Sequence, residues 1–116
     1  MIKGIGIDII EICRIEKATE NEKFIERIYT ENEIKEFLRR NKNVSYLAGR
    51  FAAKEAVSKA LGTGMRNIDF KDIEILSDNL GKPYVVTSGK LENLTIHITI
   101  SHSKDNAIAF CVIEDA

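Results

Sequence analysis

Apolar side chains alternate with small or polar ones at the start of the chain, which predicts a strand over residues 2–10. Isoleucine occupies positions 5, 7 and 9 on one face, and the other face carries Gly4, Gly6 and Asp8. Two glycines beside a carboxylate remove side-chain bulk around it, which favours a large ligand approaching Asp8. A tightly packed or bulged strand is the structural alternative.

A helical period follows over residues 11–40, with breaks near Asn21 and Tyr29. Thr30 and Glu33 have the spacing of a capping box, which indicates that a helix begins there. A third, longer helix is predicted to begin near Asn43 or Ser45. It should end at Leu61, where Gly62 can adopt the left-handed conformation that ends many helices.

The second half of the chain changes to an alternating period, typical of antiparallel strands, over residues 73–75, 84–87, 96–100 and 107–113. Turn residues occupy 78–81 and 104–106. The predicted fold class is therefore α+β, with an antiparallel sheet packed against helices that include one long helix. We expect one domain over residues 1–116.

Composition narrows the functional classes. The chain has 116 residues, 44% hydrophobic and 30% charged, which is typical of a small soluble globular protein that gains from self-association. A net charge of -1 argues against nucleic-acid binding through overall positive charge. We expect no membrane span and no secretory signal. Cys13 and Cys111 lack metal-ligand spacing, and we expect two buried, reduced thiols in a cytoplasmic protein.

One stripe of the long helix carries candidate chemistry. At 100° per residue, Ala48, Ala52, Glu55 and Lys59 fall close together. A Glu four residues before a Lys is also an ordinary surface ion pair, so spacing alone leaves the stripe's role open. With Asp8 as a second carboxylate, Glu55 suits Mg²⁺ bound to a pyrophosphate, and Lys59 suits a phosphate as a point charge.

Other groups suited to phosphate accompany this stripe: Lys59, the amides of Gly62 and Gly64, Lys82, and the turn Ser101-His102-Ser103. His102 is equally suited to bonding a phosphate or a backbone carbonyl. His97 points from a strand face opposite the isoleucines, and we expect a structural or solvated role. Ser101-His102 lacks the elbow of a hydrolase, and the Gly-x-Gly pairs are too short for a dinucleotide fingerprint.

Four blocks in order carry a family resemblance: Gly4-Ile5-Gly6-Ile7-Asp8-Ile9 with Arg14-Ile15, Phe51-Ala52-Ala53-Lys54-Glu55-Ala56 with Lys59-Ala60 and Gly62-Thr63-Gly64, Gly81-Lys82-Pro83, and Ser101-His102 with Ala107 and Ala109. Together they resemble the holo-acyl-carrier-protein synthase family over nearly the whole chain. The resemblance implies a phosphopantetheinyl transferase fold and a reaction that supports fatty acid biosynthesis. In that reaction phosphopantetheine moves from coenzyme A to a serine of apo acyl carrier protein, and 3',5'-ADP leaves.

The resemblance also implies roles for particular residues. Asp8 and Glu55 would hold Mg²⁺, with Mn²⁺ as an alternative, and with Lys59 they would be the catalytic group. The coenzyme A site would comprise Arg50, Lys59, Gly62, Thr63, Gly64, Lys82, Pro83, Ser101 and His102. Glu55, directly or through a metal-bound water, is the candidate base. The resemblance further implies a homotrimer with active sites shared between neighbouring subunits.

The acceptor is expected to be acidic, and the residues proposed to bind it are Arg14, Lys17, Lys23 and Arg27, with Arg14 as the main contact. Interleaved glutamates leave open a solvated helix of mixed charge. Two rival functions also stay open. One is a non-catalytic coenzyme A or nucleotide-binding module, and the other is a structural trimer in which Glu55 and Lys59 form only a surface ion pair.

Overall fold

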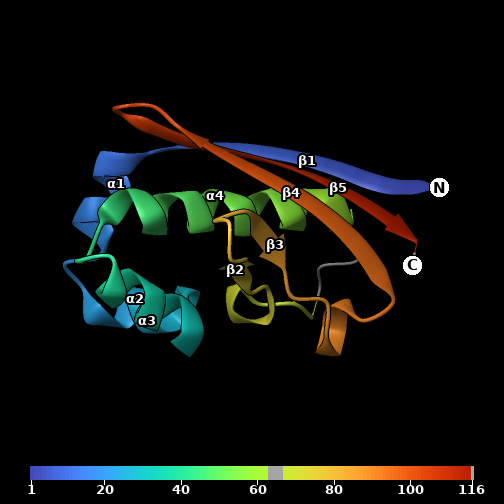
Figure 1. Ribbon diagram of the computed structural model, residues 1–116, viewed down its shortest axis with the longest axis horizontal. Coiled ribbons are helices and arrows are strands. Elements are labelled where there is room, and N and C mark those ends of the chain that lie inside the picture. The colour runs from blue at the N-terminus through green and yellow to red at the C-terminus, as the bar shows by residue number, and fades with distance from the viewer. Residues whose placement is uncertain (63–66, 116) are drawn as a thin grey trace.

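The computed structural model describes residues 1–62 and 67–115 (Figure 1). Its helices are α1 (Ile12–Ala18), α2 (Glu22–Ile28), α3 (Glu31–Arg39) and α4 (Val44–Leu61), with short 3-10 turns η2 (Phe70–Asp72) and η3 (Gly89–Leu91). Its strands are β1 (Ile2–Glu11), β2 (Ile75–Ser77), β3 (Pro83–Val85), β4 (Leu94–His102) and β5 (Asn106–Asp115). The α+β class is confirmed. Among the described residues, no helix has the length and apolar character needed to cross a membrane.

A three-stranded antiparallel sheet, in the order β1-β5-β4, lies along α4 (Figure 1). The first strand of the chain pairs with the last, so that Asp8 lies opposite Ala109. Figure 1 shows this sheet on one side of α4, and α2, α3, β2 and β3 on the other. The long helix is therefore the central element of the protein.

Strands β2 and β3 form a separate two-stranded sheet, a division that the alternating pattern did not reveal. The predicted turn between them is confirmed. Asp78 closes it by accepting hydrogen bonds at Oδ1 from the amides of Leu80 and Lys82, each at 2.9 Å. Gly81 takes a φ of 85°, which glycine adopts without steric cost.

Local signals placed the helices correctly. The Thr30 and Glu33 capping box is present, with the Thr30 amide donating to Glu33 Oε1 at 2.8 Å. Helix α4 begins after Asn43, whose side chain accepts from the Ser45 amide, and ends at Leu61. Gly62 follows with φ of 61° and ψ of -130°, so its φ is positive as expected, but it does not adopt the left-handed helical conformation. The boundaries were predictable because each depends on residues within one turn.

The glycines of β1 serve helix packing. A Cβ on Gly4 would lie 2.0 Å from the carbonyl oxygen of Ala60, and one on Gly6 would lie 1.9 Å from that of Ala56. No side chain fits in either gap, so α4 rests directly on the backbone of β1. The structural alternative for this strand face is correct, and space for a ligand does not explain the two glycines.

The opposite face of the sheet is apolar and exposed. Ile5, Ile7 and Ile9 are 63%, 54% and 62% exposed, and Phe110 of β5 is 41% exposed. Register places Ile5 beside Val112 and Ile7 beside Phe110, so these side chains form one contiguous surface. We call these four exposed residues with Val112 the open sheet face. Large apolar surfaces of this kind mark sites of association.

A buried ion pair joins α3 to α4. Lys54 and Glu33 are both 0% exposed, and Lys54 Nζ lies 2.8 Å from Glu33 Oε1. The ammonium also donates to the carbonyl oxygens of Phe70, at 2.9 Å, and Ile73, so all three of its donors are used. Glu33 Oε2 accepts from the Ile75 amide at 2.8 Å. The segment that leads into β2 is thereby tied to both helices.

The expectation of two buried thiols is half wrong. Cys111 is buried in the sheet, and its burial raises the thiol pKa to about 11. Cys13, in contrast, is exposed. Ile15 is the buried residue of α1, and two residues correspond to about 200° around a helix, so Cys13 faces away from the core.

Candidate functional site

The packing of α4 on β1 brings three predicted residues together. Lys59 Nζ lies 3.1 Å from Asp8 Oδ1 and donates to the carbonyl oxygen of Ile7 at 2.9 Å. The Asp8 side chain is only 15% exposed, whereas that of Lys59 is 54% exposed. An exposed ammonium and a largely buried carboxylate therefore meet at the edge between β1 and α4.

Glu55 lies one helical turn before Lys59 and faces the same edge. Partial burial raises the pKa of Glu55, the nearby Asp8 carboxylate raises it further, and Lys59 opposes both effects. The two carboxylates are thus close enough to repel each other when both are charged. A cation between them would relieve their repulsion.

The donor set fits Mg²⁺. Two carboxylates supply the hard oxygen ligands that this ion prefers, and the ion usually completes its octahedron with water and substrate phosphate. Within residues 1–62 and 67–115, no cluster of three or more His, Cys, Asp or Glu side chains is placed to hold a metal. Among the described residues, Asp8 and Glu55 thus offer an open site with two carboxylate ligands.

The alanines of the predicted stripe have another role. Ala48 and Ala52 are both 0% exposed. The stripe therefore starts in the core and reaches the surface only at Glu55 and Lys59. Gly62, at its end, is exposed, while Thr63 and Gly64 of the predicted phosphate loop lie outside the described residues.

Arg50 is placed in the interior, where it is only 6% exposed. Its guanidinium stacks on the Tyr46 ring at 4.3 Å and donates to Ser77 Oγ at 2.6 Å. It also donates to the carbonyl oxygen of Ile75 at 3.4 Å. Arg50 thus holds β2 against α4 in this chain. The predicted contact with a nucleotide stays a prediction.

The remaining predicted nucleotide residues lie at the opposite end of α4. Lys82 is exposed beside the β2–β3 turn, Pro83 begins β3, and Ser101 is exposed near the end of β4. His102 ends β4, and its Nε2 lies 2.9 Å from the carbonyl oxygen of Ser45. Ser45 and Glu55 are ten residues apart, about 15 Å along the helix axis.

His97 has the structural or solvated role that was expected from the sequence. His97 is 60% exposed in its side chain, and its Nε2 lies 2.6 Å from Glu114 Oε1. Both residues belong to neighbouring strands of the sheet. A surface contact of this kind fits a solvated residue and provides no ligand site.

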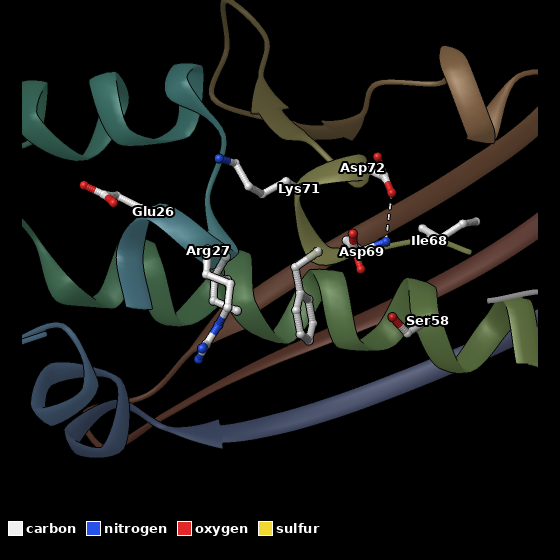
Figure 2. Close-up of a pocket in the computed structure, with 9 residues that line it drawn as sticks. Glu26, Arg27, Ser58, Ile68, Asp69, Lys71 and Asp72 are labelled. Carbon is white, nitrogen blue, oxygen red and sulfur yellow. Dashed lines mark hydrogen bonds between the residues drawn. The ribbon is translucent and has the colours of Figure 1, made fainter. Parts of the chain in front are cut away.

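The four basic residues predicted to bind an acidic partner are all exposed: Arg14 and Lys17 on α1, and Lys23 and Arg27 on α2. Arg27 lines a pocket of 720 Å³ between α2, α4 and η2. Figure 2 shows Arg27, Ser58 and Asp69 around this pocket. Ser58 immediately precedes Lys59, so the pocket adjoins the helical turn that carries the catalytic candidates.

Sequence reasoning missed the pocket wall formed by Ile68, Phe70 and Asp72. Phe70 stacks on Phe51 with ring centroids 5.6 Å apart, and Phe51 stacks on Phe24 at 6.2 Å. These three phenylalanines come from α2, α4 and η2. Nothing in their sequence spacing indicates that they meet, because the contact depends on tertiary packing.

Comparison with known proteins identifies the family of this chain. The model of the 4'-phosphopantetheinyl transferase superfamily matches residues 4–111, and this superfamily is the class that the fold and site define. A holo-[acyl-carrier-protein] synthase of Clostridium tetani is 54% identical, with 98% of this chain and 97% of the relative covered. The chain belongs to the holo-[acyl-carrier-protein] synthase family within that superfamily.

Solved structures show the same fold. A Bacillus anthracis holo-(acyl-carrier-protein) synthase in complex with CoA (3',5'-ADP) has a TM-score of 0.86 and 48% identity, covering 100% of this chain and 99% of the other. The Neisseria meningitidis holo-[acyl-carrier-protein] synthase has a TM-score of 0.89 and 39% identity, covering 99% and 100%. The predicted phosphopantetheinyl transferase fold is confirmed.

Proposed function

We propose that this protein transfers the 4'-phosphopantetheine group of coenzyme A to a serine of apo acyl carrier protein, releasing 3',5'-ADP, in support of fatty acid biosynthesis. The observation that carries the proposal is the meeting of Asp8, Glu55 and Lys59 at one edge of α4, in a chain of this family. A binding module or a structural trimer has no need for two carboxylates that repel each other.

Asp8 and Glu55 would hold Mg²⁺, with Mn²⁺ as an alternative. When bound, the ion would neutralise charge on the pyrophosphate of coenzyme A. Lys59 places a positive charge at the same edge, where it can bind a phosphate oxygen that gains charge as the bond to 3',5'-ADP breaks. Positioning and electrostatics supply most of the acceleration in phosphoryl transfer, so no protein nucleophile is required.

The acceptor serine must lose its proton as it attacks. Glu55 is the proposed base, either directly or through water. Its raised pKa makes it a better proton acceptor than an ordinary surface glutamate, and its partial exposure keeps it within reach of an incoming hydroxyl. Ser58, which lines the 720 Å³ pocket, belongs to the same turn of α4.

The acceptor protein would dock on α1 and α2. Arg14 and Lys17 on α1, with Lys23 and Arg27 on α2, give an exposed basic surface, and Arg27 also lines the pocket. Electrostatic attraction to an acidic carrier protein would speed its approach. Charge reversal at Arg14 should raise the KM for carrier protein about tenfold with little change in the KM for coenzyme A. An unchanged KM for carrier protein would remove Arg14 from this role.

A homotrimer with shared active sites completes the proposal. The open sheet face gives an apolar surface for association, with Ile7 and Phe110 at its centre. Ser45, the residue of α4 that His102 contacts, lies about 15 Å from Glu55 along the helix axis. In coenzyme A a single ribose separates the pyrophosphate from the 3'-phosphate, so these two groups are closer together than that. Two subunits could supply the two ends of the site. A fully active monomer in analytical ultracentrifugation would contradict this arrangement.

The proposed location is the cytoplasm, where Cys13 and Cys111, both free in this structure, would stay reduced.

The experiment that tests the function is intact-mass measurement of apo carrier protein incubated with this protein, coenzyme A and Mg²⁺. We expect the carrier protein to gain one phosphopantetheine, and a carrier protein with its acceptor serine replaced by alanine to gain nothing. Chelation of the metal should stop the reaction. Absence of any mass gain with either Mg²⁺ or Mn²⁺ would reject the enzyme and favour a binding module.

A further inference from the structure

The contact between His102 and α4 depends on a missing side chain. A Cβ on Gly49 would lie 2.8 Å from His102 Nε2 and 3.2 Å from its Cε1. Both distances are shorter than ordinary van der Waals contact. The imidazole ring can therefore reach the Ser45 carbonyl oxygen, 2.9 Å away, only because residue 49 is glycine.

The same contact determines where the ring carries its proton. A carbonyl oxygen only accepts hydrogen bonds, so the Nε2 of His102 must be the donor. In the neutral ring Nδ1 is then unprotonated, and it carries a proton only in the imidazolium. Nδ1 is the nitrogen left available to a ligand.

Among the described residues, the neighbours that the structure identifies beside the ring carry no charge. Helix α4 contributes Ser45 and Gly49, β4 contributes Ile100, and β5 places Ala107 opposite His102. Arg50, the next residue of α4, turns its guanidinium toward Ser77. Among residues 1–62 and 67–115, His102 forms no ion pair with a carboxylate, whereas His97 pairs with Glu114. A negative partner for an imidazolium at this position has to come from outside the described chain.

We propose that Gly49 is a positioning residue for coenzyme A recognition. Without a side chain at this position, His102 can donate its Nε2–H to the Ser45 carbonyl oxygen. The Nδ1–H of the imidazolium is then free to donate to a phosphate oxygen of coenzyme A. This inference rests on the proposed function and assigns a role to a glycine within α4. A phosphate accepts hydrogen bonds and carries negative charge, which matches a ring that has no anionic partner among residues 1–62 and 67–115. Gly49 acts only through His102.

A double-mutant cycle tests this coupling. Gly49→Ala and His102→Ala should each raise the KM for coenzyme A about tenfold, the usual cost of one charged hydrogen bond, with kcat within about twofold of wild type. In the His102→Ala background, Gly49→Ala should have no further effect, because the ring that it displaces is absent. A Gly49→Ala effect that persists without His102, or an unchanged KM in the single variant, would overturn the inference.

The same double-mutant cycle distinguishes a folding defect from the proposed effect on coenzyme A binding. Alanine is a better helix former than glycine, and the atoms nearest the new Cβ include a ring that can rotate away. If the Gly49→Ala single variant nevertheless fails to fold, the double variant, without the ring, is expected to fold. Its KM should then match that of His102→Ala, and a higher KM would contradict the proposal. His97→Ala is the matched control and should leave the KM unchanged.

The proton position has its own readout. In a His97→Ala protein, His102 is the single histidine, and nitrogen-15 NMR of its ring identifies which nitrogen carries hydrogen. We expect the Nε2–H form at alkaline pH, and a mixture of both forms after Gly49→Ala. A neutral ring protonated at Nδ1 would refute the proposed hydrogen bond from His102 Nε2–H to the Ser45 carbonyl oxygen.

The phosphate is identified by repeating the cycle with dephospho-coenzyme A. Loss of the Gly49→Ala effect assigns Nδ1 to the 3'-phosphate, and a retained effect assigns it to the pyrophosphate. An equal loss of binding with pantetheine, which lacks phosphate, would contradict phosphate recognition. Wild-type transfer to carrier protein in the mass assay is the reference, so failure of the proposed function is seen separately from failure of this inference.

Discussion

Gly6 of β1 and Ala56 of α4 are so close that a Cβ on Gly6 would lie 1.9 Å from the Ala56 carbonyl oxygen. The obstacle is backbone, which cannot move aside as the end of a side chain can. Because Asp8 follows Gly6 by two residues and Glu55 adjoins Ala56, this contact sets the separation of the two carboxylates. Helix packing and the candidate metal site therefore depend on the same pair.

Gly6→Ala should be among the most damaging single substitutions in the chain. The added methyl group forces α4 away from β1, and we expect a loss of about 3 kcal/mol in the free energy of unfolding, at the upper end for overpacking. Urea denaturation measures the loss, and metal-dependent activity should fall with it.

Gly89→Ala is the matched control, because nothing lies within 4 Å of its Cβ position. Its φ of 58° adds only local strain, which should cost about 1 kcal/mol. Equal stability losses for the two variants would show that the β1–α4 contact is not the reason for Gly6.

Glu55→Gln should separate stability from activity. The folded-state pKa of Glu55 is raised, so stability falls as pH rises from the ordinary glutamate value through the folded one, and then stays lower. A neutral glutamine removes the repulsion from Asp8, and we expect a higher Tm at pH 7 together with loss of transfer.

Scanning calorimetry and the transfer assay measure the two effects, and the Tm difference should vanish below the ordinary glutamate pKa. Glu92→Gln, at an exposed position outside the helices α1 to α4, should change neither quantity. Full turnover by Glu55→Gln would exclude Glu55 as base and as metal ligand.

Lys54→Met should unfold the protein readily, although Lys54 touches no predicted ligand. The substitution leaves the carboxylate of Glu33 buried without its cation. We expect the free energy of unfolding to fall by about 4 kcal/mol, a typical cost of breaking a buried ion pair by removing one partner. Urea denaturation of Lys54→Met, with exposed Lys35→Met as the control, measures this cost.

Adding Glu33→Gln to Lys54→Met should recover part of the loss, since no buried charge remains. Recovery is partial because Glu33 also accepts from the Thr30 and Ile75 amides. A double variant no more stable than Lys54→Met would show that the charge of Glu33 is not the cause.

The two cysteines should differ sharply in reactivity. Cys13 is exposed, while Cys111 is buried with its pKa raised to about 11. Because the thiolate is the reactive form, an alkylating reagent at pH 8 should label Cys13 at least about a hundredfold faster than Cys111 in the folded protein. Mass spectrometry of digested protein gives both rates, and denaturant should equalise them. Comparable rates in the folded state would contradict the burial of Cys111.

Sequence was sufficient where a feature depends on neighbouring residues. Thr30 and Glu33 predicted the start of α3, and Asn43 with Gly62 bounded α4, because capping depends on contacts within one turn. The same is true of the turn at Asp78. These signals gave the order of helices and strands without knowledge of their packing.

Sequence was insufficient where a residue's role depends on distant partners. Gly6 has the same pattern whether it clears space for a ligand or for Ala56, and only the position of α4 decides. Likewise, Arg50 lies in the interior because Tyr46 and Ser77 meet there. His102 had two equally suited partners in the sequence, and the structure shows that Nε2 takes the carbonyl of Ser45.

The most direct test of the proposed mechanism compares wild-type protein with Asp8→Asn in the transfer of phosphopantetheine to apo carrier protein, followed by intact mass. Both proteins should be folded, and in the presence of coenzyme A and Mg²⁺ only the wild type should add one phosphopantetheine to the acceptor serine at an appreciable rate. We expect the variant to be at least about a thousandfold slower, since its open metal site loses one of two carboxylates. Equal rates of transfer would contradict the assignment of catalysis to the edge where Asp8, Glu55 and Lys59 meet.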